Sequence, residues 1–270
     1  MRYDLKTQNL TPFMPGFSAN ELSFTKDGKG MAYVSYPEGI LWQSRTDGSD
    51  KHQLTFPPME AGLPRVSPDE SQIAFQGGLP AEPSQIFVIS AWGGTPEKVT
   101  SGNLPSGDVT WSSDGCSIAY VEGEWGSRTQ LKILNLKTRE VASVPGSEGI
   151  WSPRWSPDGR YLLATPMDAS KIVLYDFSSR TWQELAQVKA ANSPNWTPDS
   201  QCVYFNAAGG KQNLEYRVCL TDRKVEQIAD LAQAGRLVPY SGIGLAPDGS
   251  ILALRDISTE EIYALDVKFP

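Results

Sequence analysis

The sequence predicts an all-β fold, and three observations support this prediction. The 270 residues include 24 glycines, 20 prolines and 8 tryptophans, which indicates many turns and many aromatic anchors. Short apolar or alternating runs such as "SIAYV" follow polar turns at regular intervals, as expected for strands. Helical periodicity is essentially absent. With 40% hydrophobic and 20% charged residues, the chain has the composition of a globular domain that buries a core.

A single turn motif organises the chain. In residues 154–166, "RWSPDGRYLLATP", a large residue stands three positions before an aspartate, and an apolar run follows. Proline presets φ, aspartate caps the turn through its side chain, and glycine tolerates a positive φ. The motif recurs with successive aspartates 41 to 49 residues apart, and we expect these aspartates to be structural turn residues. They are Asp27, Asp69, Asp114, Asp158, Asp199 and Asp248.

Each repeat predicts four strands in order. The first strand ends at the large residue before the turn, and the second follows the turn directly. Third strands are expected at 39–44, 85–90, 130–136, 171–177, 215–220 and 261–267. Fourth strands are expected at 51–56, 96–101, 139–144, 182–187 and 225–230. Because four antiparallel strands in about 40–45 residues form one propeller blade, the sequence predicts a six-bladed β-propeller.

The two ends of the chain predict how the ring closes. The sixth repeat stops after its third strand, whereas residues 6–13 have the pattern of a fourth strand. We expect this N-terminal strand to complete the last blade, which removes exposed sheet edges. The chain then forms one domain, 1–270, with blades near 14–56, 57–100, 101–145, 146–187, 188–230 and 231–270 plus 6–13. Since residues 2–5 look like part of a third strand, we expect a longer protein of which this is the C-terminal part.

The mouth of the central channel is the expected binding site. First strands line the central channel of a propeller. We expect polar side chains four and six positions before the turn aspartate to face a ligand that enters this channel. The candidates are Glu21, Arg65, Asp108, Arg154 and Asn195. An arginine in a crowded interior needs a partner, and its fork suits a carboxylate. Two interpretations stay open: Glu21 and Asp108 neutralise the arginines in a structural network, or the arginines bind a small anionic ligand or an acidic peptide.

Composition narrows the classes of partner. The net charge is −7 and no Lys/Arg run is longer than a pair, which argues against direct nucleic-acid binding. The apolar runs are too short to cross a bilayer, so we expect no membrane insertion. The N-terminus lacks a secretory signal, and three cysteines leave the compartment, periplasmic or cytoplasmic, undecided.

Recognisable catalytic motifs are missing from the sequence. No G-x-S-x-G elbow is present, and the single histidine, His52, falls in an expected outer strand. We therefore assign no catalytic residue, no cofactor and no metal ligand. Two alternatives remain: a lactonase-type enzyme with channel Ca²⁺ near Glu21, Asp108 and Asn195, or a propeller that gates a separate hydrolase domain. The unequal repeat positions of those three residues argue against the calcium site.

Two cysteines and several tryptophans have positions that need an interpretation. If Phe205 pairs with Tyr216, Cys202 and Cys219 fall opposite one another on adjacent strands. A disulfide is possible there, but strand geometry often strains such a bond, and we favour two buried thiols. One repeat position holds tryptophans that we expect to pack between blades: Trp111, Trp155 and Trp196. Exposed aromatic contacts are expected instead at Trp92 and Trp125.

The repeated S-P-D-G turn, with its preceding aromatic residue and its following L-T tail, resembles TolB-type, WD40-like propellers over the whole chain. Residues 34–58, 145–162 and 246–267 are also similar to the C-terminal propeller of bacterial winged-helix transcriptional regulators. The resemblance implies a non-catalytic module for protein interaction or ligand sensing within such a regulator. The DNA-binding part of those regulators has no counterpart in these residues.

Overall fold

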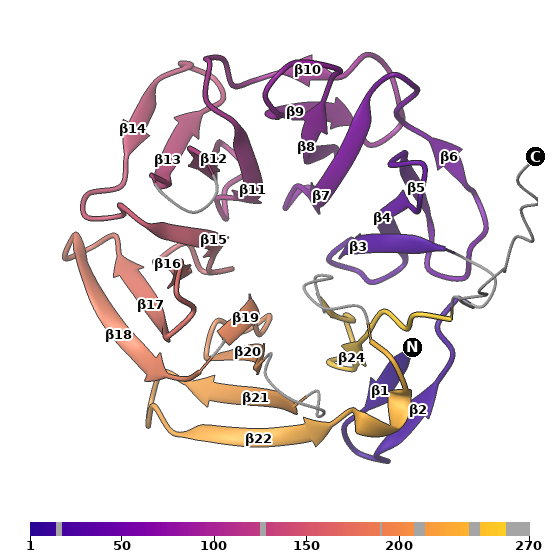
Figure 1. Cartoon of the computed structure of the whole chain (residues 1–270), viewed down its shortest axis with the longest axis vertical. Helices are drawn as coiled ribbons and strands as arrows, with labels where there is room; N and C mark the ends of the chain where they lie inside the picture. Colours follow the sequence, from indigo (N-terminus) through magenta and orange to yellow (C-terminus); the bar gives the residue numbers. More distant parts are fainter. Residues whose placement is uncertain (15–17, 125–127, 190, 208–213, 238–243, 258–270) are drawn as a thin grey trace, which may run out of the picture.

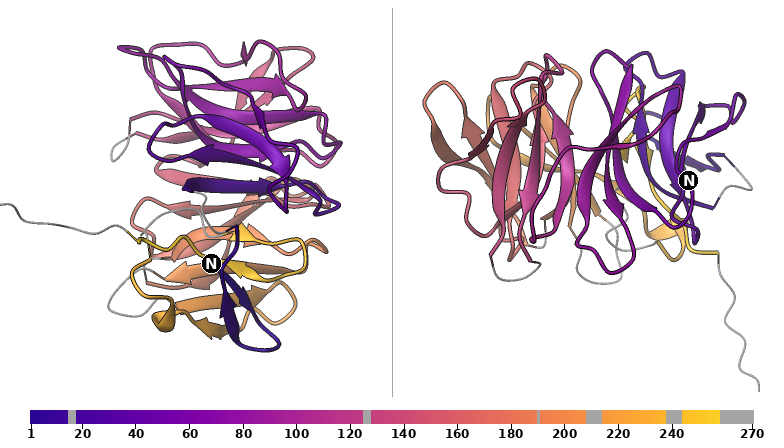
Figure 2. Two further views of the ribbon diagram at one scale, coloured as in Figure 1. Left: turned by 90° about the vertical axis from the view of Figure 1, so that its right-hand side faces the viewer. Right: turned by 90° about the horizontal axis from the view of Figure 1, so that it is seen from above.

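A ring of six blades makes up the protein, as predicted (Figure 1). The computed structural model describes residues 1–14, 18–124, 128–189, 191–207, 214–237 and 244–257. These residues form six four-stranded antiparallel sheets, and Figure 2 shows the sheets standing side by side around the ring. The one helix of this described part is the short η1 (Ala232–Ala234). Within the same ranges, no helix has the length and apolarity that a membrane crossing requires.

Five blades are continuous in sequence. Blade 1 contains β3 (Ala19–Phe24), β4 (Gly30–Ser35), β5 (Leu41–Arg45) and β6 (His52–Gln53). Blade 2 contains β7 (Glu60–Val66), β8 (Gln72–Gly78), β9 (Gln85–Ser90) and β10 (Glu97–Lys98). Blade 3 contains β11 (Ser106–Trp111), β12 (Ser117–Glu122), β13 (Gln130–Asn135) and β14 (Val141–Ser143). Blade 4 contains β15 (Ile150–Trp155), β16 (Tyr161–Pro166), β17 (Lys171–Asp176) and β18 (Thr181–Gln187). Blade 5 contains β19 (Ala191–Trp196), β20 (Cys202–Ala207), β21 (Leu214–Cys219) and β22 (Val225–Asp230).

Blade 6 joins the two ends of the chain. Its strand order is β23 (Gly244–Leu245), β24 (Ile251–Leu252), β1 (Arg2–Asp4) and β2 (Asn9–Thr11). The N-terminus therefore supplies two strands and not one, because β1 pairs with β24 in the third position. The third strand expected at 261–267 lies outside the described residues. Ring closure by an N-terminal fourth strand is confirmed.

Apolar layers between neighbouring blades form the core. Between blades 4 and 5, for example, Leu163, Ile172, Trp196 and Phe205 are buried in one cluster. Similar clusters lie between blades 1 and 2, 2 and 3, and 3 and 4. Because each blade buries one face against the next, the ring is held together by burial of apolar surface.

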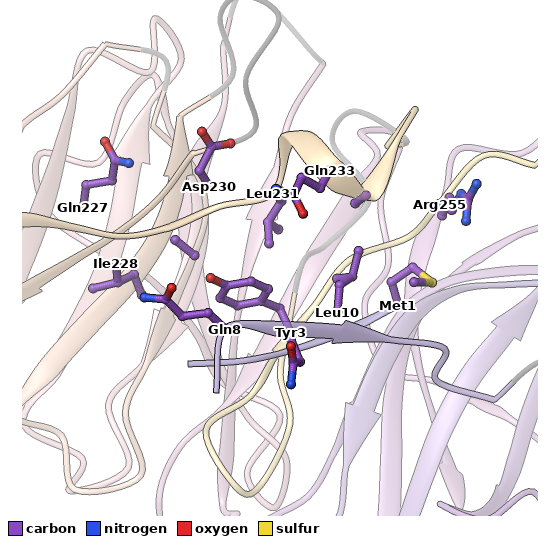
Figure 3. Close-up of a pocket in the computed structure, with 13 residues that line it drawn as sticks. Met1, Tyr3, Gln8, Leu10, Gln227, Ile228, Asp230, Leu231, Gln233 and Arg255 are labelled. Carbon is purple, nitrogen blue, oxygen red and sulfur yellow. The ribbon is translucent and has the colours of Figure 1, made fainter. Parts of the chain in front are cut away.

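The seam between blades 5 and 6 is less completely filled. A cavity of about 770 Å³ lies between β22 with η1 on one side and β1 with β2 on the other. Figure 3 shows the ring of Tyr3 in the middle of this seam, with Ile228 and Leu231 on one side and Leu10 on the other.

The six turn aspartates occupy the hairpins between first and second strands. The side chain of Asp158 shows the pattern, because its Oδ1 accepts hydrogen bonds from Ser156 Oγ at 2.6 Å and Arg160 N at 3.0 Å. The same pair of bonds recurs at Asp27, Asp69, Asp114 and Asp199. At Asp248 the hydroxyl is missing, since Ala246 stands two positions earlier; Ser250 N donates to Oδ1, and the guanidinium group of Arg2 donates to Oδ2.

Blade 5 carries a disulfide between adjacent strands. Phe205 pairs with Tyr216, and Cys202 lies directly opposite Cys219. The two Cα atoms are 4.0 Å apart and the sulfurs are bonded. The favoured interpretation of two free thiols is therefore wrong, because the register brings the two side chains together. Of the two expected surface tryptophans, Trp92 is 80% exposed and Trp125 lies outside the described residues.

Candidate functional site

A repeated bulge shapes the first strands of five blades. In five first strands the residue six positions before the turn aspartate is not glycine, yet it has a positive φ of 47° to 56°. These residues are Glu21, Leu63, Asp108, Ser152 and Ser193. In each strand the pairing register shifts at this point, as in a β-bulge. A bulge re-aims side chains, and positive φ costs energy at such residues, so the surrounding strands must hold this conformation.

Three charged residues from the first strands of three blades meet next to these bulges. Asp108 on β11 lies between Arg65 on β7 and Arg154 on β15. Its Oδ1 is 2.7 Å from Arg154 Nη1 and 3.7 Å from Arg65 Nη2. The side chains of Asp108, Arg65 and Arg154 are 13%, 20% and 11% exposed. The structure thus brings together the two predicted arginines around a single carboxylate oxygen.

Each arginine also bonds to its own strand. The Nη1 atoms of Arg65 and Arg154 donate to the carbonyl oxygens of the preceding prolines, Pro64 and Pro153, at 2.8 and 2.7 Å. The Nε of Arg154 is buried and has no hydrogen-bond partner in the described part of the chain. Donor groups of the two guanidinium groups therefore outnumber the acceptors that the site supplies.

Glu21 on β3 contributes the second carboxyl group. Its Oε2 accepts a hydrogen bond from Leu63 N–H on the next blade. Burial raises the pKa of Glu21, although the hydrogen bond from Leu63 and the charge of Arg65 oppose this change. Burial and then repulsion from Arg154 lower the pKa of Arg65 to about 10, so this arginine stays charged at neutral pH. The site therefore holds two cations, one firmly paired carboxylate and one carboxyl group shifted towards its neutral form.

The predicted Asn195 lies on β19, and its Nδ2 donates to Ser193 O on the same strand at 3.0 Å. This bond ties the amide group to its own strand, whereas the two arginines share an oxygen of Asp108 across three blades. The structure therefore brings together Glu21, Arg65, Asp108 and Arg154, and a role for Asn195 in the site stays a prediction.

Sequence reasoning missed the residues that hold the arginines in place. The indole Nε1 atoms of Trp111 and Trp196 donate to the carbonyl oxygens of Arg65 and Arg154 on the preceding blades, both at 2.9 Å. Trp155 differs, because its Nε1 donates to Gly159 O in its own turn. The sequence signal for this hydrogen bond is an arginine four positions before the turn aspartate of one blade and a tryptophan three positions before the turn aspartate of the next blade.

The surroundings of Asp108 argue against a calcium ion at this position. Among the residues that the structure describes, no three His, Cys, Asp or Glu side chains come together as a metal-binding group. The Oδ1 of Asp108 is already shared by two guanidinium groups, and a cation placed there would be repelled by both.

Comparison with known proteins places the chain in a family. The TolB beta propeller domain matches residues 84–267. The Tol-Pal system protein TolB of Alcanivorax borkumensis is 40% identical over 86 residues, covering 32% of this chain and 20% of that protein. The chain spans between 16% and 58% of the length of the curated relatives that it matches.

Solved structures show the same fold. A putative TolB from Agrobacterium tumefaciens superposes with a TM-score of 0.74 at 20% identity, covering 94% of this chain and 95% of that one. An oligogalacturonate lyase in complex with manganese gives 0.59 at 14% identity, covering 82% and 68%. Proteins with and without an enzyme name therefore share this architecture, and the fold alone does not decide between them. The match over residues 84–267 shows that this chain belongs to the TolB beta propeller domain family.

Proposed function

We propose that this chain is a non-catalytic interaction module whose channel mouth binds the carboxylate groups of an acidic peptide segment of a protein partner. The observation that carries the proposal is the convergence of Arg65 and Arg154 on one oxygen of Asp108. One carboxylate cannot satisfy two guanidinium groups, and the pKa of the second carboxyl group, on Glu21, is raised by burial. An incoming carboxylate would supply the missing acceptors. The TolB relative, named for the Tol-Pal system, supports a protein as the partner.

The competing interpretation is that the same residues form a structural network only. Calorimetric titration separates the two, using a capped hexaglutamate peptide, a capped hexaserine peptide as the neutral control, and acetate as a small anion. The test variant is Arg65→Ala with Arg154→Ala. Its matched control is Arg139→Ala with Arg160→Ala, which removes two charges whose side chains are 47% and 57% exposed.

We expect the wild-type protein to bind hexaglutamate with an affinity that falls as the salt concentration rises. The affinity should be at least about tenfold weaker in the test variant and unchanged in the control. Acetate binding without peptide binding would assign the site to small anions. A wild-type protein that binds neither probe, combined with a destabilised test variant, would leave only the network. Equal binding by a folded test variant would overturn the proposal.

We further propose that this module is the sensory or interaction part of a longer bacterial regulator. Support comes from the likeness of residues 34–58, 145–162 and 246–267 to the propellers of winged-helix regulators. The test is the open reading frame upstream of residue 1, where a winged-helix segment would support the proposal. A secretory signal sequence directly upstream would contradict it.

A further inference from the structure

The cavity of about 770 Å³ in the seam between blades 5 and 6 takes no part in the proposed function. One of its walls comes from β22 and η1, and the other comes from residues 1–10. Because β22 and β2 are the outermost strands of their sheets, the cavity lies at the outer side of the ring (Figure 1). No residue of the charge cluster lines it, where the charge cluster means Glu21, Arg65, Asp108 and Arg154. A volume of this size is typical of small-molecule pockets, which measure about 300–1,000 Å³.

Four amide side chains line the cavity, two from each wall. Gln8 and Asn9 belong to the blade 6 wall, and Gln227 and Gln233 belong to the blade 5 wall. All four residues are exposed, and none of their side chains has a hydrogen-bond partner within the described ranges. In Figure 3 Gln8 and Gln227 lie at one end of the cavity, with Tyr3 further along it. Each amide group offers both donors and an acceptor to a molecule in the cavity.

The charges of the lining side chains balance one another. Asp230 and Arg255 are the two charged side chains among the lining residues, so the walls carry one charge of each sign. The Oδ1 of Asp230 accepts a hydrogen bond from Ala232 N at 2.9 Å, which leaves Oδ2 as an acceptor for a ligand. Either an anionic or a cationic ligand would meet one of these charges as a like charge. The balance therefore favours a neutral ligand.

The floor of the cavity is apolar. Tyr3, Leu10, Ile228 and Leu231 line it and belong to one apolar cluster. The faces of a sugar ring carry C–H groups, and these pack against aromatic and aliphatic surfaces. The hydroxyl groups at the edge of the ring both donate and accept hydrogen bonds, as the amide groups of the walls do.

We propose that this seam cavity binds a neutral sugar of the size of a disaccharide. The four amide groups and Asp230 bond to its hydroxyl groups, and the floor around Tyr3 packs against its C–H groups. Because the two walls come from blades 5 and 6, a bound sugar joins the blade that contains the N-terminal strands to its neighbour. Binding therefore also stabilises the closure of the ring.

The experiment titrates the full chain with maltose and with cellobiose by calorimetry and saturation-transfer NMR. Capped triglycine, which has donors and acceptors but no sugar ring, is the comparison ligand. The test variant is Gln227→Ala with Gln233→Ala. We expect it to weaken the binding of the disaccharide at least about tenfold. Its matched control is Gln72→Ala with Asn103→Ala, which removes two exposed amide groups that do not line the cavity and should leave binding unchanged.

A second variant tests the opposite wall and keeps the proposal testable if the first fails to fold. Gln8 has a φ of 57°, which glycine also adopts, so Gln8→Gly removes the amide group without new backbone strain. It should weaken the binding of the disaccharide about three- to tenfold. The proposal is overturned if the wild-type protein binds neither disaccharide, or binds capped triglycine equally well. It is also overturned if the folded test variant or the Gln8→Gly protein binds the disaccharide as the wild type does.

Discussion

Asn206 and Glu215 lie directly opposite one another on β20 and β21, and each has a buried side-chain oxygen without a hydrogen-bond partner in the described structure. Cross-strand partners have Cβ atoms about 5 Å apart. Both Asn206 Oδ1 and Glu215 Oε1 are acceptors when the carboxyl group is ionised, so a proton on Glu215 supplies a donor for Asn206 Oδ1. Glu215 is 3% exposed, and burial raises its pKa to about 8.

This pair predicts that stability falls with rising pH. Between the ordinary glutamate pKa of 4.5 and a folded pKa of about 8, the unfolded chain loses the Glu215 proton while the folded chain keeps it. The free energy of unfolding therefore decreases across this window and levels off above it. Glu215→Gln removes the titration and should flatten the decline, with a gain of at most about 5 kcal/mol at pH 8. Urea unfolding of both proteins at pH 5 to 9 measures the free energy of unfolding and its decline with pH.

The neighbouring Glu226 provides the control. It is paired with Arg217 at 2.7 Å, and the hydrogen bond from this guanidinium group lowers its pKa. Its contribution to stability is therefore present above the unfolded pKa and lost as pH falls below it. Glu226→Gln should leave the decline between pH 5 and 8 in place. An equal decline in the Glu215→Gln protein would contradict the assignment of the titration to Glu215.

The repeated turn motif made the fold predictable from the sequence. The site was less predictable, because it depends on backbone conformations and contacts between blades that the motif does not encode. Six similar turns fix the blades because each turn uses local chemistry that the sequence displays. The positive φ at Glu21 and Asp108 has no local signature, since neither residue is glycine, and only the pairing with the next strand imposes it. Arg65 and Arg154 were predictable from their repeat position, whereas their convergence on one oxygen depends on three blades at once.

The closure of the ring shows the same limit. The third-strand pattern occurs at both ends of the chain, in residues 2–5 and 261–267, and a local pattern cannot decide which segment pairs with β24. In the structure Arg2–Asp4 takes this position, with Tyr3 opposite Ile251. Burial of Tyr3 and Leu10 in the blade 6 cluster adds a tertiary contribution that the pattern does not contain.

Deletion of residues 1–14 is the test of closure. It removes β1 and β2, exposes the edge of β24, and takes Tyr3, Leu5 and Leu10 from the apolar cluster. We expect the Tm to fall by at least about 10 °C, with aggregation through the open edges. Lys6→Ala with Thr7→Ala, two exposed positions in the same hairpin, should leave the Tm unchanged. A truncated chain that stays monomeric and equally stable would show that these strands do not close the ring.

The three repeat tryptophans should not be equivalent. Trp111 and Trp196 are 7% and 9% exposed and bond to the preceding blade, whereas Trp155 is less buried and bonds within its own turn. We expect replacement by alanine to cost about 3–5 kcal/mol at Trp111 and Trp196 and about 2 kcal/mol at Trp155. Denaturant unfolding measures all three. Losses below about 1 kcal/mol at every site would show that the tryptophans do not anchor the blades.

The last prediction concerns the charge that joins blades 2, 3 and 4. Asp108→Asn keeps the shape of the side chain and removes the negative charge from between Arg65 and Arg154. Removing one partner of a buried ion pair leaves the other charge uncompensated, which costs about 3–5 kcal/mol.

The double-mutant cycle with Arg154→Leu measures how much of this cost depends on Arg154. If the two guanidinium groups repel one another once Asp108 is neutral, removing one of them relieves that repulsion. Asp108→Asn should then cost at least about 2 kcal/mol less in a protein that already carries Arg154→Leu than in the wild-type protein. Arg139→Leu, which removes a charge on an exposed loop, should give no such rescue. Additive losses in the Asp108→Asn, Arg154→Leu protein would mean that Asp108 and Arg154 are not coupled. The charge cluster would then not hold the three blades together.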